Sequence, residues 1–244
     1  MNDITPDYGP RARIGIATPQ ANPTVEPEMR ALMPPSIGVY ATRLVHAAPD
    51  VETRLDHYIR HLPAAIASFG VLNIAAFGFG CTGSSYRAGA TLEDQHTAEA
   101  SAATRLPVIT AAQAIRAALR HLGATRIALV SPYPEALANA GVAYWESTGI
   151  RVYESLRVDP ALTDTHRIYE LTSHDALQAA QTLSKRDIDC IVLSGTGMPT
   201  LAALAQLHHT ETVPVISSNA CLAWCLLRAI APELAPETPS GFFR

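Results

Sequence analysis

Cys81 is the side chain of this sequence best placed to do chemistry. It follows the apolar segment FGFG and begins a run of glycine and hydroxyl residues, CTGSSY. Glycine lets the backbone approach a ligand closely, and successive N–H groups at the start of a helix form an anion site. Such N–H groups also lower the pKa of a thiol. We predict that Cys81 is a nucleophile or proton donor beside an anion site; the alternative is a small buried cysteine, the ordinary fate of a free thiol.

A second loop of the same kind lies late in the chain, with the sequence SGTGMPT. It contains Gly195, Thr196 and Gly197 but no thiol. Its backbone N–H groups are predicted to hold a carboxylate, and the alternative is a tight turn between a strand and a helix.

Two further candidates lie near predicted helices. In the segment PQANPTVEPE, Thr24 is a natural N-cap, and Asn22 need be no more than a turn residue. Tyr133 lies between two prolines that fix it on a rigid loop. Its hydroxyl is a candidate for binding a carboxylate, unless its ring only covers the core.

The other titratable side chains give weaker signals. None of the nine histidines has metal-ligand spacing, and only His46 and His166 lie near the loops. Cys190 starts an apolar strand, while Cys221 and Cys225 lie one turn apart on an apolar helix. These three thiols are predicted to lie in the core, and no metal site is expected.

The elements that position these loops come in two similar halves. Four segments of the first half return in the same order in the second: RIGIATP as RIALVSP, VYATRLV as VYESLRV, FGFGCTGSS as VLSGTGMPT, and PVIT as PVIS. Each half alternates short apolar runs with longer amphipathic stretches, the pattern of parallel strands joined by crossover helices.

This pattern predicts an α/β fold of two halves related by a pseudo-twofold axis. Each half is expected to hold a short four-stranded parallel sheet flanked by helices. The halves are residues 1–123, with parts of the C-terminal segment packed on it, and residues 124–244. Strands are predicted at 13–18, 38–45, 71–77, 107–109, 126–131, 150–155, 189–194 and 213–216, and helices include 55–69, 111–122, 136–147, 174–184 and 220–231. Because ligands bind at the carboxyl ends of parallel strands, the active site is expected in the cleft between the halves.

Composition excludes several classes of protein. Hydrophobic residues make up 48% and charged residues 16% of the chain, which argues against disorder and predicts a homo-oligomer whose contacts cover part of the surface. The net charge of −4 gives no basic footprint for nucleic acid, and no apolar run reaches the length of a membrane-spanning helix. The polar, proline-interrupted start, MNDITPDYGPRA, is not typical of a signal peptide. We expect a cytoplasmic protein that binds neither nucleic acid nor membranes.

Together the motifs resemble the aspartate/glutamate racemase superfamily, in particular its maleate isomerase and arylmalonate decarboxylase branch. The segments that carry the resemblance span most of the chain: ATPQANPTVEPEM, FGCTGSSY, VSPYPEAL and LSGTGMPTL. The resemblance implies a small carboxylate or dicarboxylate substrate, no metal or organic cofactor, and a cysteine that acts on a carbanion stabilised by a carboxylate.

Position by position, the resemblance implies that Cys81 is the catalytic cysteine of the first half. The substrate-binding residues that it implies are Asn22, Thr82, Gly83, Tyr133, Gly195, Thr196 and Gly197. Gly195 stands where relatives place a second cysteine, which argues against two-base racemisation. By pseudo-symmetry, a Gly195→Cys thiol is expected to face Cys81 across the substrate.

Two reactions remain open to a single thiol. As a thiolate, Cys81 would add to the double bond of maleate and leave after rotation to give fumarate, a reaction that the Asn22 motif favours. As a thiol, Cys81 would protonate the enediolate left when a disubstituted malonate loses CO₂, a reaction that the single cysteine favours. A further alternative is a non-catalytic carboxylate-binding protein, which would tolerate Cys81→Ser without loss of affinity.

We expect Cys81 to be the only cysteine needed for turnover, because the other three are predicted to be core residues. Single replacement of each cysteine by alanine, followed by an activity assay and circular dichroism, tests this expectation. Activity that survives in Cys81→Ala, or that disappears in a well-folded Cys190→Ala, would contradict the assignment.

Overall fold

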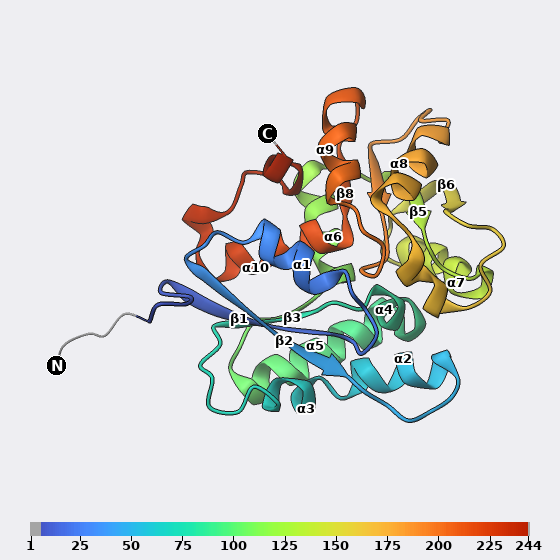
Figure 1. The fold of residues 1–244 in the computed structure, drawn as a ribbon. Helices are drawn as coiled ribbons and strands as arrows, with labels where there is room; N and C mark the ends of the chain where they lie inside the picture. The colour runs from blue at the N-terminus through green and yellow to red at the C-terminus, as the bar shows by residue number, and fades with distance from the viewer. Residues whose placement is uncertain (1–5, 244) are drawn as a thin grey trace.

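The computed structural model describes residues 6–243 as two parallel four-stranded sheets flanked by helices (Figure 1). The first sheet has the order β2-β1-β3-β4, and its strands are β1 (Ala12–Pro19), β2 (Ile37–Leu44), β3 (Ala76–Phe79) and β4 (Val108–Thr110). The second has the order β6-β5-β7-β8, and its strands are β5 (Arg126–Ser131), β6 (Arg151–Arg157), β7 (Cys190–Leu193) and β8 (Val215–Ser217). The identical order confirms the predicted α/β class and the internal repeat.

Helices cover both faces of the first sheet, with α3 and α5 below it and α1 and α10 above it in Figure 1. The helices of the first half are α1 (Val25–Leu32), α2 (Val51–Arg60), α3 (Leu62–Ala67), α4 (Thr82–Ala88), α5 (Ala90–Thr104) and α6 (Ala111–Leu122). Those of the second half are α7 (Glu135–Ser147), α8 (Ser173–Thr182), α9 (Leu201–Thr210) and α10 (Ser218–Ile230), with 3₁₀ turns η1 (Thr165–Glu170), η2 (Pro232–Leu234) and η3 (Pro239–Phe243).

The central strands are buried on both faces, as their continuous apolar sequences require. Every residue of β3 and of β7 is buried. The register pairs Ala17 of β1 with Phe79 of β3, and Val130 of β5 with Leu193 of β7. The loops that follow these paired strands therefore emerge side by side at the carboxyl edge of each sheet.

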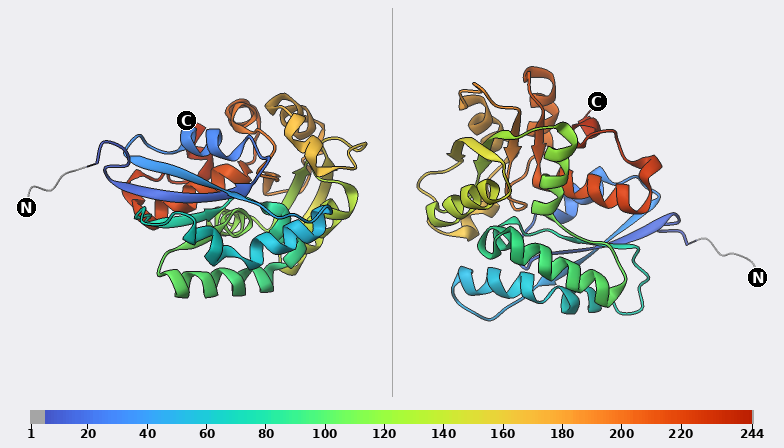
Figure 2. Two further views of the ribbon diagram at one scale, coloured as in Figure 1. Left: turned by 60° about the horizontal axis from the view of Figure 1, so that its bottom comes forward. Right: turned by 180° about the vertical axis from the view of Figure 1, so that it is seen from behind.

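Helices α6 and α10 pack against each other where the two halves meet, as the right-hand view of Figure 2 shows. Although α10 ends the repeat of the second half, it also contacts α1 and β3 of the first half. Gly78 in β3 permits this approach, because an added Cβ would lie 2.9 Å from Leu226 Cδ1 of α10. The last helix thus covers the sheet that precedes Cys81.

Several predicted bounds differ from the structure for local reasons. The predicted strand at 71–77 begins only at Ala76, because the chain turns at Gly70 with a φ of +58° and leaves Val71 exposed. The predicted helix at 55–69 is two helices that meet at His61, where Pro63 fits the first turn of α3 but cannot continue α2. No bounds were predicted for helices α4, α5 and α9.

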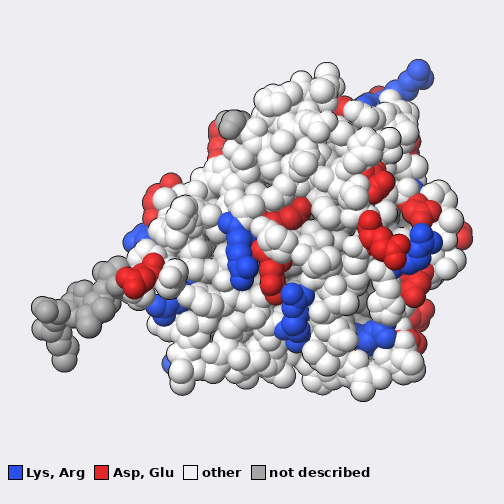
Figure 3. Space-filling view, viewed as in Figure 1, with Lys and Arg blue, Asp and Glu red and all other residues white. Residues whose placement is uncertain are grey.

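Charged side chains lie scattered over the face shown in Figure 3, with acidic and basic residues near one another. Across residues 6–243, the structure contains no helix of the length and apolar character needed to cross a membrane.

Candidate active site

A cavity of about 580 Å³ lies where the loops of the two halves meet. It is lined by most of the predicted site residues, namely Asn22, Cys81, Gly83, Tyr133, Thr196 and Gly197. Each of these residues lies just beyond the carboxyl end of a strand, so the shared edge of the parallel sheets brings them together.

Cys81 lies at the start of α4, lines the cavity and is only 4% exposed. Its Sγ is 3.2 Å from Ser84 Oγ. Burial raises the pKa of the Cys81 thiol, while hydrogen bonds from the Ser84 hydroxyl and from the N–H groups of Ser84 and Gly83 lower it. Because burial is the larger effect, the thiol is favoured at neutral pH, and a thiolate would form with donors already in place.

Asn22 lines the cavity, and its side chain binds the backbone at the start of α1. Its Oδ1 accepts hydrogen bonds from the N–H groups of Thr24, at 2.8 Å, and Val25, at 3.2 Å. Thr24 is the N-cap residue of α1, as predicted, but its side chain makes no capping hydrogen bond, and its hydroxyl donates to the Gly197 carbonyl at 2.8 Å. Within the described chain the Nδ2 group of Asn22 has no protein partner, so it can donate to a ligand.

The second-half loop is fixed to the first half by hydrogen bonds through its own backbone and hydroxyl. Thr196 Oγ1 donates to the Gly80 carbonyl at 2.9 Å, next to Cys81. Since the Thr196 hydroxyl is engaged there, the groups that this loop can offer a carboxylate are backbone N–H groups.

Thr82 and Gly195 do not line the cavity, although both were expected at the substrate. Thr82 Oγ1 donates to Ser218 Oγ at 3.2 Å, and the Gly195 N–H donates to the same oxygen at 3.0 Å. Ser218, which was not predicted as a site residue, therefore joins the two glycine-rich loops from the start of α10. Thr82 and Gly195 remain candidates only through their backbone.

Gly195 has a φ of +94°, which favours glycine, and it lies against a rigid ring. An added Cβ would lie 2.6 Å from Pro132 Cγ and 3.5 Å from Tyr133 Oη. The loop as it stands cannot accept the expected Gly195→Cys side chain without moving Pro132.

Three tyrosines lie around the Cys81 thiol. Tyr133 was predicted as a site residue, whereas Tyr58 and Tyr169 were not. All three line the cavity. Burial raises the pKa of Tyr58 and of Tyr169, and raises that of Tyr133 well above 10. Their hydroxyls therefore stay protonated at neutral pH and act as hydrogen-bond donors.

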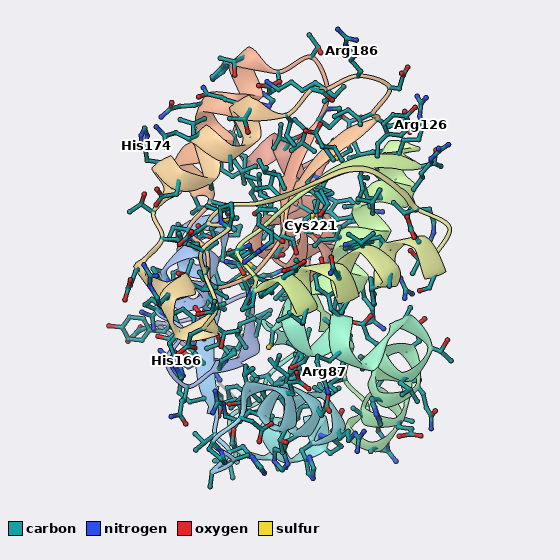
Figure 4. All side chains as sticks on the ribbon, turned by 90° about the vertical axis from the view of Figure 1, so that its right-hand side faces the viewer. Arg87, Arg126, His166, His174, Arg186 and Cys221 are labelled. Carbon is teal, nitrogen blue, oxygen red and sulfur yellow. The ribbon has the colours of Figure 1, made fainter. Side chains whose placement is uncertain are left out.

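The rim of the cavity carries His46, His166 and Arg54. His46 Nδ1 accepts the Ala48 N–H at 3.2 Å, and Arg54 donates to the Ala48 carbonyl at 2.9 Å. His166 is exposed on η1 and lies at the margin of the molecule in Figure 4. His46 and His166 therefore both line the cavity, which agrees with their positions near the loops in the sequence.

The other cysteines lie away from this cavity. Cys190 and Cys221 are fully buried, and Figure 4 shows Cys221 inside the molecule. Cys225 is partly exposed, and its Sγ lies 3.8 Å from the Ala114 carbonyl. The core positions predicted for Cys190 and Cys221 are confirmed, whereas Cys225 lies at the edge of the core.

Glu28 of α1 is a buried carboxylate that was not predicted as a site residue. It accepts the N–H groups of Thr200, at 2.5 Å, and Leu201, at 3.1 Å, at the start of α9. Asn219 Nδ2 donates to it at 2.7 Å and also to the Thr196 carbonyl at 3.2 Å. Glu28 thereby fixes the second-half loop against the helix that Asn22 caps.

Known enzymes resemble this chain over most of its length. The family model described as arylmalonate decarboxylase matches residues 14–243. A protein named maleate isomerase from Nocardia farcinica is 27% identical over 230 residues, which cover 89% of this chain and 90% of that protein. A maleate isomerase from Geobacillus stearothermophilus is 25% identical over 234 residues, which cover 89% and 91% of the two chains.

Solved structures share the fold. The Nocardia farcinica maleate cis-trans isomerase C194S mutant, solved with a covalently bound succinylcysteine intermediate, superposes with a TM-score of 0.83 at 23% identity and covers 96% of this chain and 98% of its own. An arylmalonate decarboxylase superposes with a TM-score of 0.72 at 24% identity and covers 95% and 97%.

Gly195→Ala is expected to lower the free energy of unfolding by more than Gly149→Ala does. Both glycines have a positive φ, +94° and +81°, but only Gly195 has neighbours within 4 Å of an added Cβ. The contact with Pro132 should cost about 1–3 kcal/mol beyond the backbone strain that both variants share. Urea unfolding of the two variants measures the difference, and equal losses would show that the Pro132 ring yields freely.

Glu28→Ala is expected to lower the free energy of unfolding by about 2–3 kcal/mol, because buried N–H donors lose their acceptor. Displacement of the second-half loop should also reduce kcat/KM by at least ~10-fold. Glu28→Gln keeps one acceptor oxygen and should restore most of both. Urea unfolding and steady-state kinetics give the two quantities.

The matched control is Glu146→Ala, at an exposed position of α7. Full kcat/KM in Glu28→Ala, or equal losses in the Gln and Ala variants, would refute a positioning role for the carboxylate.

Proposed function

The chain belongs to the arylmalonate decarboxylase family, and on that basis we propose that it catalyses the cis–trans isomerisation of maleate or a closely related dicarboxylate. The observation that carries the proposal is a single thiol, Cys81, on the wall of a cavity between glycine-rich loops of opposite halves. The similarity to proteins named maleate isomerase, one solved with a covalently bound succinylcysteine intermediate, supports a reaction through a cysteine adduct.

In the proposed reaction the Cys81 thiolate adds to one carbon of the double bond. A C–S bond forms, and the π electrons move to the neighbouring carbon and its carboxylate. The former double bond is now single and rotates. Expulsion of the thiolate restores the double bond in the trans geometry, so the cycle needs no atoms beyond the substrate and Cys81.

Neutral donors stabilise the negative charge in this scheme. The Asn22 Nδ2 group, the Tyr133 hydroxyl and backbone N–H groups of the second-half loop can all point at substrate carboxylates. Removal of one such preorganised donor commonly costs ~10²–10³ in rate. Arg54 at the rim adds a cation toward which a second carboxylate can be oriented.

The carbanion must survive without protonation until the C–S bond breaks. No thiol stands at position 195, and burial keeps the pKa of the Tyr133 hydroxyl well above 10. Tyr133 therefore donates a hydrogen bond without readily releasing its proton. This arrangement favours rotation and elimination over a saturated product.

One observation favours a second candidate function, decarboxylation of an arylmalonate. Burial raises the pKa of Cys81, so the thiol form dominates at neutral pH. A thiol is the form that would protonate the enediolate left by loss of CO₂.

We further propose a homo-oligomer located in the cytoplasm. The low charged fraction of 16% supports a surface partly covered by subunit contacts.

Incubation with maleate in deuterated buffer is expected to give fumarate without deuterium, because the carbanion is never protonated. Proton NMR follows the product, and chelator treatment should leave the rate unchanged. The rate should rise with pH, because burial raises the pKa of Cys81 and the thiolate fraction grows as pH approaches that value.

Phenylmalonate in the same buffer distinguishes the alternatives. Phenylacetate carrying one new deuterium, with no fumarate from maleate, would replace isomerisation by decarboxylation. Tight binding of either compound, retained in Cys81→Ser and without turnover, would indicate a binding protein instead.

A further inference from the structure

The cavity at Cys81 is much larger than maleate. Its volume is about 580 Å³. Maleate has about eight non-hydrogen atoms, which would fill ~240 Å³ if each occupied the ~30 Å³ of a water molecule in the liquid. More than half of the cavity would remain empty around the substrate.

Apolar side chains border the cavity next to the loop that carries Cys81. A Cβ added to Gly83 would lie 3.3 Å from Leu137 Cδ2 and 3.5 Å from Leu55 Cδ1. Gly83 is two residues from Cys81, and its N–H faces the Cys81 sulfur. The two leucines therefore form an apolar wall beside the point where a bond to sulfur would form.

The opposite loop is covered in the same way. A Cβ added to Gly197 would lie 3.2 Å from Ile168 Cγ2 and 2.9 Å from Tyr169 Cε1. Both residues line the cavity. The polar donors for a dicarboxylate thus lie between two apolar surfaces, one formed by Leu55 and Leu137 and the other by Ile168 and the Tyr169 ring. A substrate that contacted only the donors would leave both surfaces without a contact.

A second hollow of about 500 Å³ continues from the leucine wall. The two hollows share Val51, Arg54, Leu55, Leu137, Thr165 and His166. The second is bordered further by the apolar residues Pro49, Pro134, Ala136 and Ala140 and by the polar residues Glu52, Arg87, Thr163 and Asp164. A group that extends from the substrate past Leu55 and Leu137 would enter it.

We propose that the preferred substrate is a maleate that carries an apolar alkyl or aryl substituent on one carbon of its double bond. The substituent packs against Leu55, Leu137 and Val51, while the carboxylates bind the polar donors. This inference rests on the proposed isomerase function and specifies its substrate class.

The chemistry suits such a substrate. The thiolate adds to the unsubstituted carbon, which is the less hindered one, and the electron pair moves to the substituted carbon and its carboxylate. After rotation the C–S bond breaks and the thiolate leaves with both of its electrons. No proton reaches the substituted carbon, as a site with glycine at position 195 requires.

The first test compares kcat/KM for maleate, 2-methylmaleate and 2-phenylmaleate. Each value is divided by the rate at which free 2-mercaptoethanol isomerises the same compound, which removes differences in intrinsic reactivity. One added methyl group in an apolar pocket is worth ~10-fold or more, so the normalised kcat/KM should rise at least ~10-fold for methyl and ~100-fold for phenyl. A value for maleate equal to or above both would overturn the inference.

A matched pair of variants locates the subsite. Val51→Phe adds volume to a residue that lines both hollows, whereas Val71→Phe makes the same change at an exposed position that lines neither. The ratio of kcat/KM for 2-phenylmaleate to that for maleate should fall at least ~10-fold in Val51→Phe and stay unchanged in Val71→Phe. An unchanged ratio in Val51→Phe would show that the substituent does not lie at this wall.

Binding of saturated analogues separates failure of this inference from failure of the proposed function. Calorimetric titration with succinate and 2-phenylsuccinate should give at least ~10-fold tighter binding of the phenyl compound. Tighter binding with no turnover of any maleate would uphold the subsite and refute the isomerase. Fastest turnover of plain maleate with equal binding of both succinates would uphold the isomerase and refute the subsite.

Discussion

The carboxylate of Glu28 is the interaction on which the geometry of the candidate site depends, because it joins α1 of the first half to α9 and α10 of the second. One turn before it, the Thr24 carbonyl accepts the Glu28 N–H, and α1 begins under the cap of Asn22. Glu28 in turn accepts the first N–H groups of α9. One helix therefore sets the position of a first-half donor and of the second-half loop.

Burial nonetheless raises the pKa of Glu28 above its ordinary value, so its contribution to stability is greatest at pH below 4.5 and falls as pH rises toward the folded-state pKa. The fold thus includes the free-energy cost of burying the Glu28 carboxylate, and the carboxylate in return fixes the second-half loop.

The same exclusion of water governs the reactive groups. Burial raises the pKa of Cys81 and of the tyrosines around it, so the groups around the sulfur are neutral hydroxyls, while the cation Arg54 lies at the rim. Hydrogen bonds to a developing anion are stronger in such a medium than in water, and donors fixed in advance need no rearrangement. Burial raises the pKa of the Cys81 thiol and so disfavours the nucleophilic thiolate. Hydrogen bonds from the N–H groups of Gly83 and Ser84 to the sulfur lower the same pKa. Packing and chemistry thus depend on the same glycine, because any side chain at position 83 would press on Leu137.

The sequence allowed prediction of the groups that follow strands. Cys81, Thr196 and Gly197 follow β3 and β7, and the internal repeat placed both loops at equivalent edges of their sheets. Residues that act across the two halves were beyond prediction. Glu28 belongs to an amphipathic segment, VEPEM, where a carboxylate normally faces water, and only the tertiary fold turns it toward α9. Ser218 gave no signal for the same reason, since its partners Thr82 and Gly195 are distant in the chain. The leucine wall is also invisible in the sequence, because Leu55 and Leu137 look like ordinary core positions of two helices.

The two halves have similar folds, but their glycine-rich loops differ in chemistry. Both halves place a glycine-rich loop at the end of their third strand, yet only one loop carries a thiol. In the other, the Pro132 ring occupies the place of a side chain at Gly195, and the Tyr133 hydroxyl lies 3.5 Å from the position that a Cβ would take. A thiol there would be able to exchange protons with the substrate, whereas a tyrosine whose pKa is raised well above 10 holds its proton. Under the proposed function the substrate is therefore attacked from the first half and only hydrogen-bonded from the second. An intermediate held in this way can rotate and expel its nucleophile, and glycine at position 195 offers it no second thiol to make it a saturated or racemised product.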